Sequence, residues 1–205
     1  MQKLTSHVME ALSQRGFIVH HAETASQAKA LLLSLVPQGA SVGIGGSMTL
    51  KEMDIESALA AQGHEVFWHW TAPADQRAQV TVSAQHADVY LASSNAVTKQ
   101  GQIVNIDGNG NRVAGMFYGP QKVILVIGEQ KLVDGGLNTA IARIKRHACP
   151  PNAKRLGLDT PCAHTGVCNE NQCGDGCMCR VTTVLDRPTR GREITVILVE
   201  EAIGY

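Results

Sequence analysis

Ser41-Val-Gly-Ile-Gly-Gly-Ser-Met-Thr49 is a short apolar run that ends in glycines, and residues 50–61 behind it have helical spacing. This order predicts a strand over 41–44, then a glycine turn and a helix. Glycines let backbone N–H groups approach a ligand closely, and the N-terminus of a helix favours negative charge. We therefore expect the turn to bind an anion such as a phosphate or a carboxylate.

Candidate site residues at this turn fall into two groups. The candidate ligand-binding residues are Gly43, Gly45, Gly46, Ser47 and Thr49, and Glu52, further along the helix, is a candidate catalytic residue. The turn lacks the lysine of a P-loop and the third glycine of the dinucleotide fingerprint, so neither ATP nor NAD is indicated. The alternative is a tight turn that needs glycine only for its backbone angles.

Strands and helices alternate along most of the chain, which is typical of a parallel sheet with helices on both faces. We predict helices over 2–14, 75–85 and 138–147, a further helix between Thr24 and Pro37, and strands over 17–19, 65–69, 88–92, 123–127, 182–185 and 194–199. A hairpin is expected where strands 103–106 and 112–114 flank the Asp-Gly and Asn-Gly pairs. The predicted fold class is α/β, a layered and mostly parallel sheet with one antiparallel hairpin excursion.

A second polar segment lies at the end of a predicted strand. Residues 93–98, Ser-Ser-Asn-Ala-Val-Thr, follow the predicted strand 88–92. Ligands of open α/β sheets bind beyond the carboxyl ends of the strands. Ser94 and Asn95 are therefore candidate ligand-binding residues, although loops of this composition are often only turns.

The third candidate is the glycine-rich segment 105–112. Hairpin chemistry accounts for most of it but not for Arg112, whose guanidinium can clamp a carboxylate or phosphate with two hydrogen bonds. We treat Arg112 as a candidate catalytic residue. Asp107 and Asn111 are candidate binding residues that would orient it.

Length and charge limit the class of protein. A chain of 205 residues fits one compact domain with an appendage, and we expect an α/β domain over 1–148, a Cys-rich segment over 149–180 and strands over 181–205 that return to the main domain. The formal net charge is zero, so no long-range field favours nucleic acid or a membrane as a partner. Small molecules or proteins are better candidates.

The N-terminal residues show no export signal, and the longest apolar stretch, 122–128, is too short to cross a bilayer. We therefore expect a cytoplasmic protein, in which structural disulfides are disfavoured. All six cysteines lie within residues 149–179, in a segment without sustained periodicity: Cys149, Cys162, Cys168, Cys173, Cys177 and Cys179. Thiolates gathered in this way suit an iron–sulfur cluster or Zn²⁺, and His164 is a further candidate ligand. The spacings match neither a zinc ribbon nor a ferredoxin motif, and free thiols or redox disulfides are the alternatives.

Several of these motifs together resemble the lactate-utilisation (LUD) domain family. They are residues 43–52, 87–98, 104–113, 118–124 and 199–204, and the shorter, Cys-tailed members are most similar. The resemblance implies a fold similar to ribose-5-phosphate isomerase and the CoA transferases, and a link to lactate oxidation beside an iron–sulfur redox subunit. It also favours an iron–sulfur cluster, of the 4Fe–4S type, over zinc. Those relatives share cysteines at the places of Cys149, Cys162 and Cys168, whereas the stretch 173–179 departs from them and leaves the fourth ligand open.

Three functions remain open. The first is a redox-linked protein of lactate-type hydroxyacid utilisation that binds a small anionic metabolite or nucleotide and carries the metal centre. The second is an isomerase-like or acyl-transferase-like enzyme with Glu52 as the acid/base group and a structural metal. The third is a non-catalytic sensor or assembly subunit. The sequence decides neither whether the chain is an enzyme nor whether it forms a homodimer.

Overall fold

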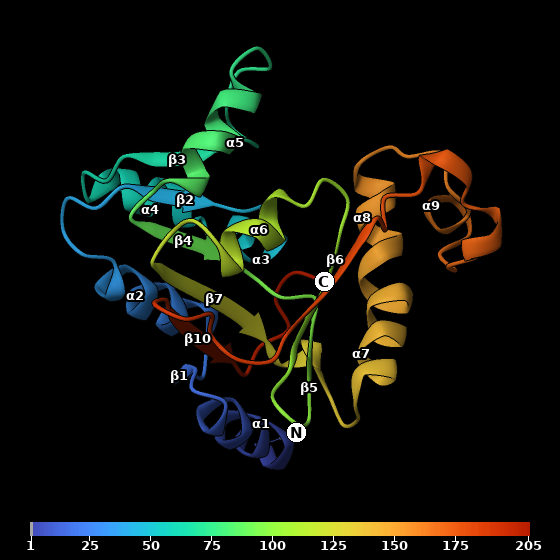
Figure 1. The fold of residues 1–205 in the computed structure, drawn as a ribbon, viewed down its shortest axis with the longest axis horizontal. Helices are drawn as coiled ribbons and strands as arrows, with labels where there is room; N and C mark the ends of the chain where they lie inside the picture. The colour runs from blue at the N-terminus through green and yellow to red at the C-terminus, as the bar shows by residue number, and fades with distance from the viewer. Residues whose placement is uncertain (1) are drawn as a thin grey trace.

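The computed structural model describes residues 2–205 as an α/β fold with two sheets (Figure 1). The larger sheet has six parallel strands in the order β1-β10-β7-β4-β2-β3. Their bounds are β1 Ile18–Ala22, β2 Val42–Ile44, β3 Val66–Trp68, β4 Val89–Ala92, β7 Lys122–Gly128 and β10 Glu193–Val199. This confirms the mostly parallel α/β architecture expected from the sequence.

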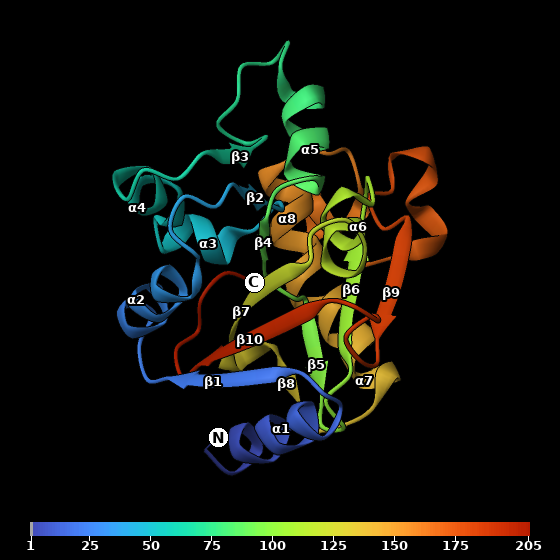
Figure 2. The ribbon, with the colours of Figure 1, turned by 60° about the vertical axis from the view of Figure 1, so that its left-hand side comes forward.

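The smaller sheet has four strands in the order β8-β5-β6-β9. Their bounds are β5 Ala96–Thr98, β6 Ile103–Asp107, β8 Leu132–Val133 and β9 Val181–Leu185. Strand β6 pairs antiparallel with both β5 and β9, whereas β5 pairs parallel with β8. The antiparallel excursion is therefore a separate small sheet that stands beside the main one (Figure 2).

Helices cover both faces of the larger sheet. The helices are α1 Gln2–Gln14, α2 Ala25–Leu35, α3 Met48–Glu52, α4 Ile55–Ala61, α5 Arg77–Gln85, α6 Asn111–Phe117, α7 Leu137–Arg143, α8 Cys149–Arg155 and α9 Pro161–Thr165. Helices α2, α3 and α4 pack on one face, and α1, α5, α6 and the smaller sheet pack on the other. Strand β4 shows why, because Val89 and Leu91 enter the first core and Tyr90 and Ala92 enter the second. A strand buried on both sides reads as a continuous apolar run.

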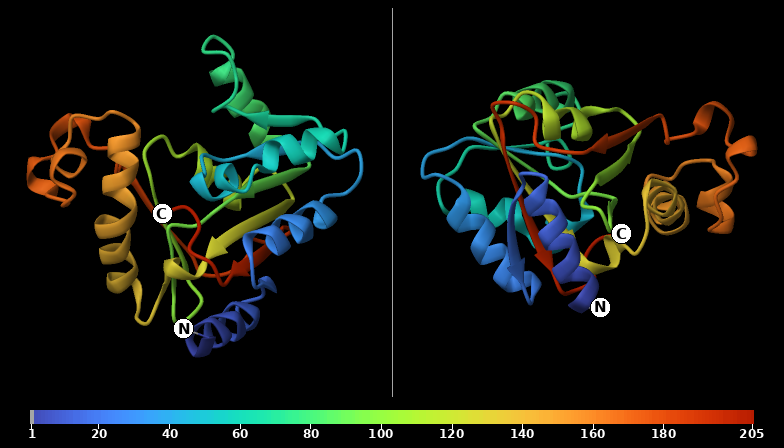
Figure 3. Two further views of the ribbon diagram at one scale, coloured as in Figure 1. Left: turned by 180° about the vertical axis from the view of Figure 1, so that it is seen from behind. Right: turned by 60° about the horizontal axis from the view of Figure 1, so that its bottom comes forward.

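A third core lies on the outer side of the smaller sheet. Val104 and Ile106 of β6 pack there against Ala140 of α7 and against Ile144, in the π-helical turn Ile144–Ala148 that joins α7 to α8. Helix α7, this turn and α8 form one column beside the smaller sheet, and α9 with the rest of the Cys-rich segment projects beyond it (Figure 3). Within residues 2–205, no helix combines the length and the apolar character needed to cross a bilayer.

The helix starts follow the sequence rules with one interruption. The Thr24 side chain accepts the N–H of Gln27, as in a capping box, whereas the Gln27 side chain accepts the N–H of Glu23, one residue before the N-cap of α2. The single helix predicted over 50–61 is instead two helices, α3 and α4. Asp54 separates them in the left-handed conformation, with φ of 48°.

The hairpin predicted over 103–114 is wrong in its second half. Strand β6 forms as expected, but residues 111–117 are helix α6, and β6 takes β5 and β9 as its partners. The Asp107 carboxylate accepts the N–H of Gly110, whose positive φ of 82° then starts the helix. Asp-Gly and Asn-Gly pairs can adopt left-handed backbone angles at the start of a helix as well as in a hairpin turn. The sequence pattern therefore predicted a hairpin where a helix begins.

The expectation of an irregular segment over 149–180 is also wrong in part. Cys149–Arg155 and Pro161–Thr165 are helical, and two 3₁₀ turns, Glu170–Gln172 and Gly174–Gly176, follow. Helices α8 and α9 both carry proline in the first turn, where a missing N–H breaks no helical hydrogen bond. The prolines therefore start these helices.

Candidate functional site

The loops that follow β2, β4, β7 and β10 meet at one edge of the larger sheet, because these strands run parallel and in register. A cavity of about 700 Å³ opens at this edge. Of the residues predicted to form the site, it is lined by Gly46, Ser47, Thr49, Ser94, Asn95, Asp107, Asn111 and Arg112. The glycine turn, the segment after β4 and the segment after β6 thus come together although they are far apart in the sequence.

The three glycines of the turn have different surroundings. Gly43 lies within β2, where an added Cβ would come within 2.2 Å of the Ala84 carbonyl oxygen on α5, and it does not line the cavity. At Gly45 an added Cβ would lie 2.9 Å from both the Arg112 side chain and the Tyr90 hydroxyl. Gly46 lines the cavity beside the Trp70 ring. Gly43 and Gly45 therefore permit close packing, and Gly46 faces a ligand space.

Gly43→Ala should lower the free energy of unfolding by roughly 1–3 kcal/mol, because the new methyl group would push β2 and α5 apart. Gly136→Ala is a matched control, since nothing lies within 4 Å of its added Cβ and its φ is −93°. Urea denaturation followed by circular dichroism compares the two. Equal stability of both variants would contradict the close approach of β2 to Ala84.

The start of helix α3 is held by side chains of the turn itself. The Ser47 hydroxyl accepts the N–H of Leu50 at 3.3 Å. Thr49 is buried, and its hydroxyl lies 3.3 Å from both the Ser93 hydroxyl and the Ile203 carbonyl. Glu52 is exposed and is not among the cavity-lining residues, since its carboxylate accepts the N–H of Gly204 at 2.7 Å. Its role as an acid/base group stays a prediction.

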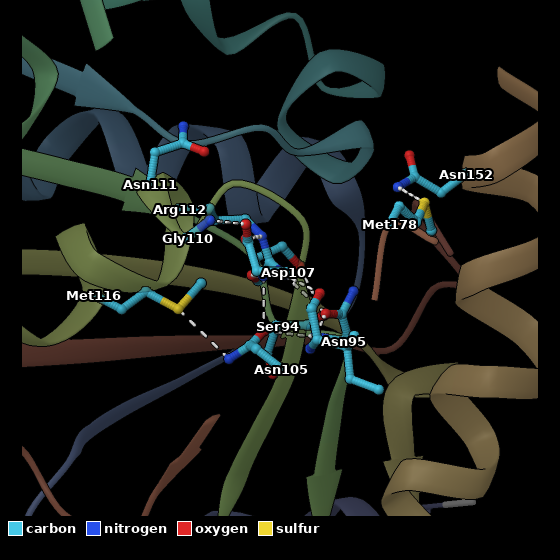
Figure 4. A network of polar contacts seen from close by, with 12 residues as sticks. Ser94, Asn95, Asn105, Asp107, Gly110, Asn111, Arg112, Met116, Asn152 and Met178 are labelled. Atoms are coloured by element: carbon cyan, nitrogen blue, oxygen red, sulfur yellow. Dashed lines mark hydrogen bonds and ion pairs between the residues drawn. The ribbon is translucent and has the colours of Figure 1, made fainter. Parts of the chain in front are cut away.

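Arg112 is buried and binds two segments together through its terminal nitrogens (Figure 4). Nη1 donates to the Ser93 carbonyl at 3.0 Å and to the Asn105 side chain at 2.7 Å. Nη2 donates to the Asn95 side chain at 2.9 Å and to the Ile106 carbonyl at 3.0 Å. These contacts fix the loop after β4 against strand β6.

The remaining guanidinium donor, Nε, faces the Asp107 carboxylate at 3.2 Å. A guanidinium has five N–H groups; protein oxygens accept four of them here, and the fifth lies in the ion pair with Asp107. None is left to donate to a ligand unless one of these contacts breaks. Arg112 therefore positions Asn95 and Asp107 on the cavity wall. The Asn111 side chain stands apart from this network in Figure 4, and its backbone carbonyl accepts a hydrogen bond from Gln85.

Lys131 is the site residue that the sequence pattern missed. Its side chain is 2% exposed, and its Nζ donates to the Thr49 hydroxyl at 2.7 Å and to the Ser93 hydroxyl at 3.1 Å on the cavity wall. Within residues 2–205, no carboxylate forms an ion pair with it. Burial, followed by Arg143 and Arg112, lowers the pKa of Lys131 to about 7, whereas Glu52 acts in the opposite direction. The sequence feature that could have identified Lys131 is its position: it follows the apolar run of β7, and this strand ends at the same sheet edge.

Basic side chains dominate the wall of the cavity. They are Lys51, Arg77, Arg112, Lys131, Arg155 and Arg180, against the single carboxylate of Asp107. The Arg155 guanidinium also lies 4.5 Å from the centroid of the Trp70 ring, and both residues line the cavity. A cleft lined by one sign of charge raises the local concentration of ligands of the opposite sign.

Comparison with known proteins shows the family of this chain. The LUD domain model matches residues 5–199. The chain belongs to the LUD domain family. Membership of this family associates it with lactate utilisation. The crystal structure of a DUF162 family protein from Deinococcus radiodurans, determined at 1.70 Å, matches with a TM-score of 0.54 and 15% identity over 97% of each chain. At that identity the likeness shows the fold alone, and no curated protein matches the chain.

In this LUD domain protein the cysteines gather beyond the end of α7. Cys149 Sγ lies 3.4 Å from Cys179 Sγ, and Cys177 is close enough to influence the titration of both Cys173 and Cys179. Cys168 is close enough to influence the titration of Cys149 and Cys173. Nevertheless, no group of three or more His, Cys, Asp or Glu side chains within residues 2–205 is arranged to hold a metal ion.

In the contacting pair of Cys149 and Cys179, the surroundings favour deprotonation of Cys179. The hydrogen bond with Cys149 lowers the pKa of Cys179 to about 6, and the Lys145 ammonium acts in the same direction. The same hydrogen bond, followed by burial, raises the pKa of Cys149. His164, the other candidate ligand, is exposed, and its Nε2 lies 2.7 Å from the Asp159 carboxylate.

Proposed function

We propose that this LUD domain protein acts in lactate-type hydroxyacid utilisation, binding a small anionic metabolite in the cavity and carrying a metal centre on its cysteine segment. The proposal rests on one observation: the cysteine segment forms part of the wall of the anion-binding cavity. Gly176, Cys177, Met178 and Arg180 of the cysteine segment line the same cavity as the glycine turn. A ligand in the cavity would therefore lie against the segment that holds the thiols.

Charge and size support an anionic metabolite. The wall carries more basic than acidic groups, and the buried Lys131 lacks a carboxylate partner within the described residues. A bound carboxylate or phosphate would supply the missing negative charge. The volume of about 700 Å³ lies within the range of small-molecule sites.

The donor set fits a thiolate-bound metal. An iron–sulfur cluster or Zn²⁺ needs four soft ligands, and six thiols are available in one segment with Cys149 and Cys179 already in contact. Lys145 would offset part of the negative charge of the thiolates. A cluster would supply one-electron transfer, whereas zinc would only organise the segment. Electron transfer by a cluster would require a protein partner, for which we propose an iron–sulfur redox subunit.

Metal analysis tests this proposal. Protein purified without oxygen should be brown and contain iron and acid-labile sulfide, and Cys149→Ser should lose most of both, because its Sγ contacts that of Cys179. Met178→Leu is the control, since it removes a sulfur from the same segment without removing a thiolate. Colourless protein with stoichiometric zinc would eliminate electron transfer, and protein with neither metal would contradict the metal centre.

A further inference from the structure

Lys131 has the surroundings of a reactive amine. Its Nζ is buried at the cavity wall and contacts two hydroxyl groups, those of Thr49 and Ser93. A buried ammonium ordinarily has a carboxylate partner, because an unpaired charge in a protein interior is strongly destabilising. The described residues provide none within ion-pair distance, and Asp107, the acidic residue of the cavity wall, is already paired with Arg112.

The charged groups around Lys131 come from three helices. Arg112 of α6 and Arg143 of α7 repel its proton, and Glu52 of α3 attracts it more weakly. Desolvation and neighbouring cations are the two devices by which proteins keep a lysine neutral and nucleophilic. Both are present and lower the pKa of Lys131 to about 7, so a substantial fraction of the amine has a free electron pair at neutral pH.

We propose that Lys131 is a covalent attachment site for a small carbonyl compound that also carries a carboxylate or phosphate. The inference rests on the proposed anion-binding function of the cavity and names the ligand class. The carbonyl group follows from the nucleophilic amine, with which it forms an imine. The acidic group follows from the basic residues on the cavity wall, which would hold it beside the amine.

Imine formation between Nζ and the carbonyl compound needs neither an oxidant nor a reductant. The electron pair of Nζ forms a bond to the carbonyl carbon, and the carbonyl oxygen takes up a proton to become a hydroxyl group. This first proton comes from Nζ itself. A second proton, taken from solvent, lets the hydroxyl leave as water when the C=N bond forms, so the neutral amine, the carbonyl compound and one proton give a protonated imine and one water molecule. The Thr49 and Ser93 hydroxyls lie at 2.7 Å and 3.1 Å from Nζ, within reach to pass these protons.

Reductive trapping on the full chain tests the proposal. We would incubate the protein with pyruvate or, separately, dihydroxyacetone phosphate, in the presence of sodium cyanoborohydride, and map the adduct by peptide mass spectrometry. The adduct should lie on Lys131 for at least one probe, which also tells a carboxylate ligand from a phosphate ligand. Lys131→Arg should reduce trapping at least about tenfold, because a guanidinium forms no imine under these conditions. Lys122→Arg is the control: this lysine does not line the cavity and pairs with Glu193, so its replacement should retain the adduct.

Two outcomes would overturn the attachment site. One is the absence of any Lys131 adduct with both probes, and the other is labelling spread equally over the other lysines. Peptide mapping of the unaltered chain gives this answer even if Lys131→Arg fails to fold. Calorimetric titration with the same two compounds separates the claims, because binding without trapping would remove the covalent step and leave the anion site. Absence of both would count against the proposed function as well.

Discussion

Arg112→Met should lower the free energy of unfolding by about 3–5 kcal/mol, which is the effect of removing one partner from a buried ion pair. The guanidinium holds the Asp107 carboxylate at 3.2 Å, and Met would leave that carboxylate without its counter-ion. Two carbonyl groups, those of Ser93 and Ile106, would lose a donor as well. Urea denaturation at pH 7.5, followed by circular dichroism, measures the loss.

Arg77→Met is the control for Arg112→Met. Arg77 also lines the cavity, but it is exposed and its Nε donates only to the Ala72 carbonyl, so its replacement should change stability by about 0.5 kcal/mol or less. The two variants remove the same charge from the same wall. If Arg112→Met were as stable as Arg77→Met yet no longer bound an anion, Arg112 would be a ligand-binding residue and its protein contacts would be secondary.

The parallel half of the fold could be predicted because it depends on local patterns. Strands such as β4 and β7 are buried on both faces and appear as continuous apolar runs, and residues 75–85 before β4 and 138–147 after β7 have helical spacing. Once the strands are parallel, the segments after β2 and β4 must share one edge of the sheet. Ser47 and Asn95 could therefore be placed in one site from the sequence alone.

The smaller sheet could not be predicted because its pairing is long-range. Strand β6 lies between β5 and β9, and β9 follows it only after helices α6 to α9. Nothing within 103–114 distinguishes a second hairpin strand from helix α6. The same limit applies to Arg112, because a guanidinium that clamps a ligand and one that is saturated by protein oxygens have the same local sequence.

Lys131 shows a related limit on the site. A lysine beside the apolar pair Leu132-Val133 resembles a surface residue at the end of a strand. Its burial depends on Thr49 and Ser93, and an added Cβ at Gly204 would lie only 3.1 Å from Nζ, so three separate segments enclose it. Such an environment is a property of the assembled sheet edge, and the lowered pKa of the amine follows from it.

Between pH 7.5 and pH 10, the unaltered chain should gain stability relative to Lys131→Met by about 1.4 kcal/mol per pH unit, or about 3 kcal/mol in all. Burial lowers the pKa of Lys131 from 10.5 to about 7. In this window the unfolded chain holds the proton and the folded chain does not, so folding releases a proton and becomes more favourable as the pH rises. Below pH 7 both states hold the proton, above pH 10.5 neither does, and the difference becomes constant.

Urea denaturation of both chains at several pH values measures this difference. Methionine at position 131 has no proton to release, so the comparison cancels the titration of the tyrosines and of the cysteine segment, which both chains share. A difference that does not change with pH would mean that Lys131 keeps its proton in the folded chain. The amine would then be an ammonium at neutral pH, suited to holding an anion but not to attacking a carbonyl carbon. The pH dependence of stability therefore tests, without any ligand, whether the nucleophile required for the imine exists.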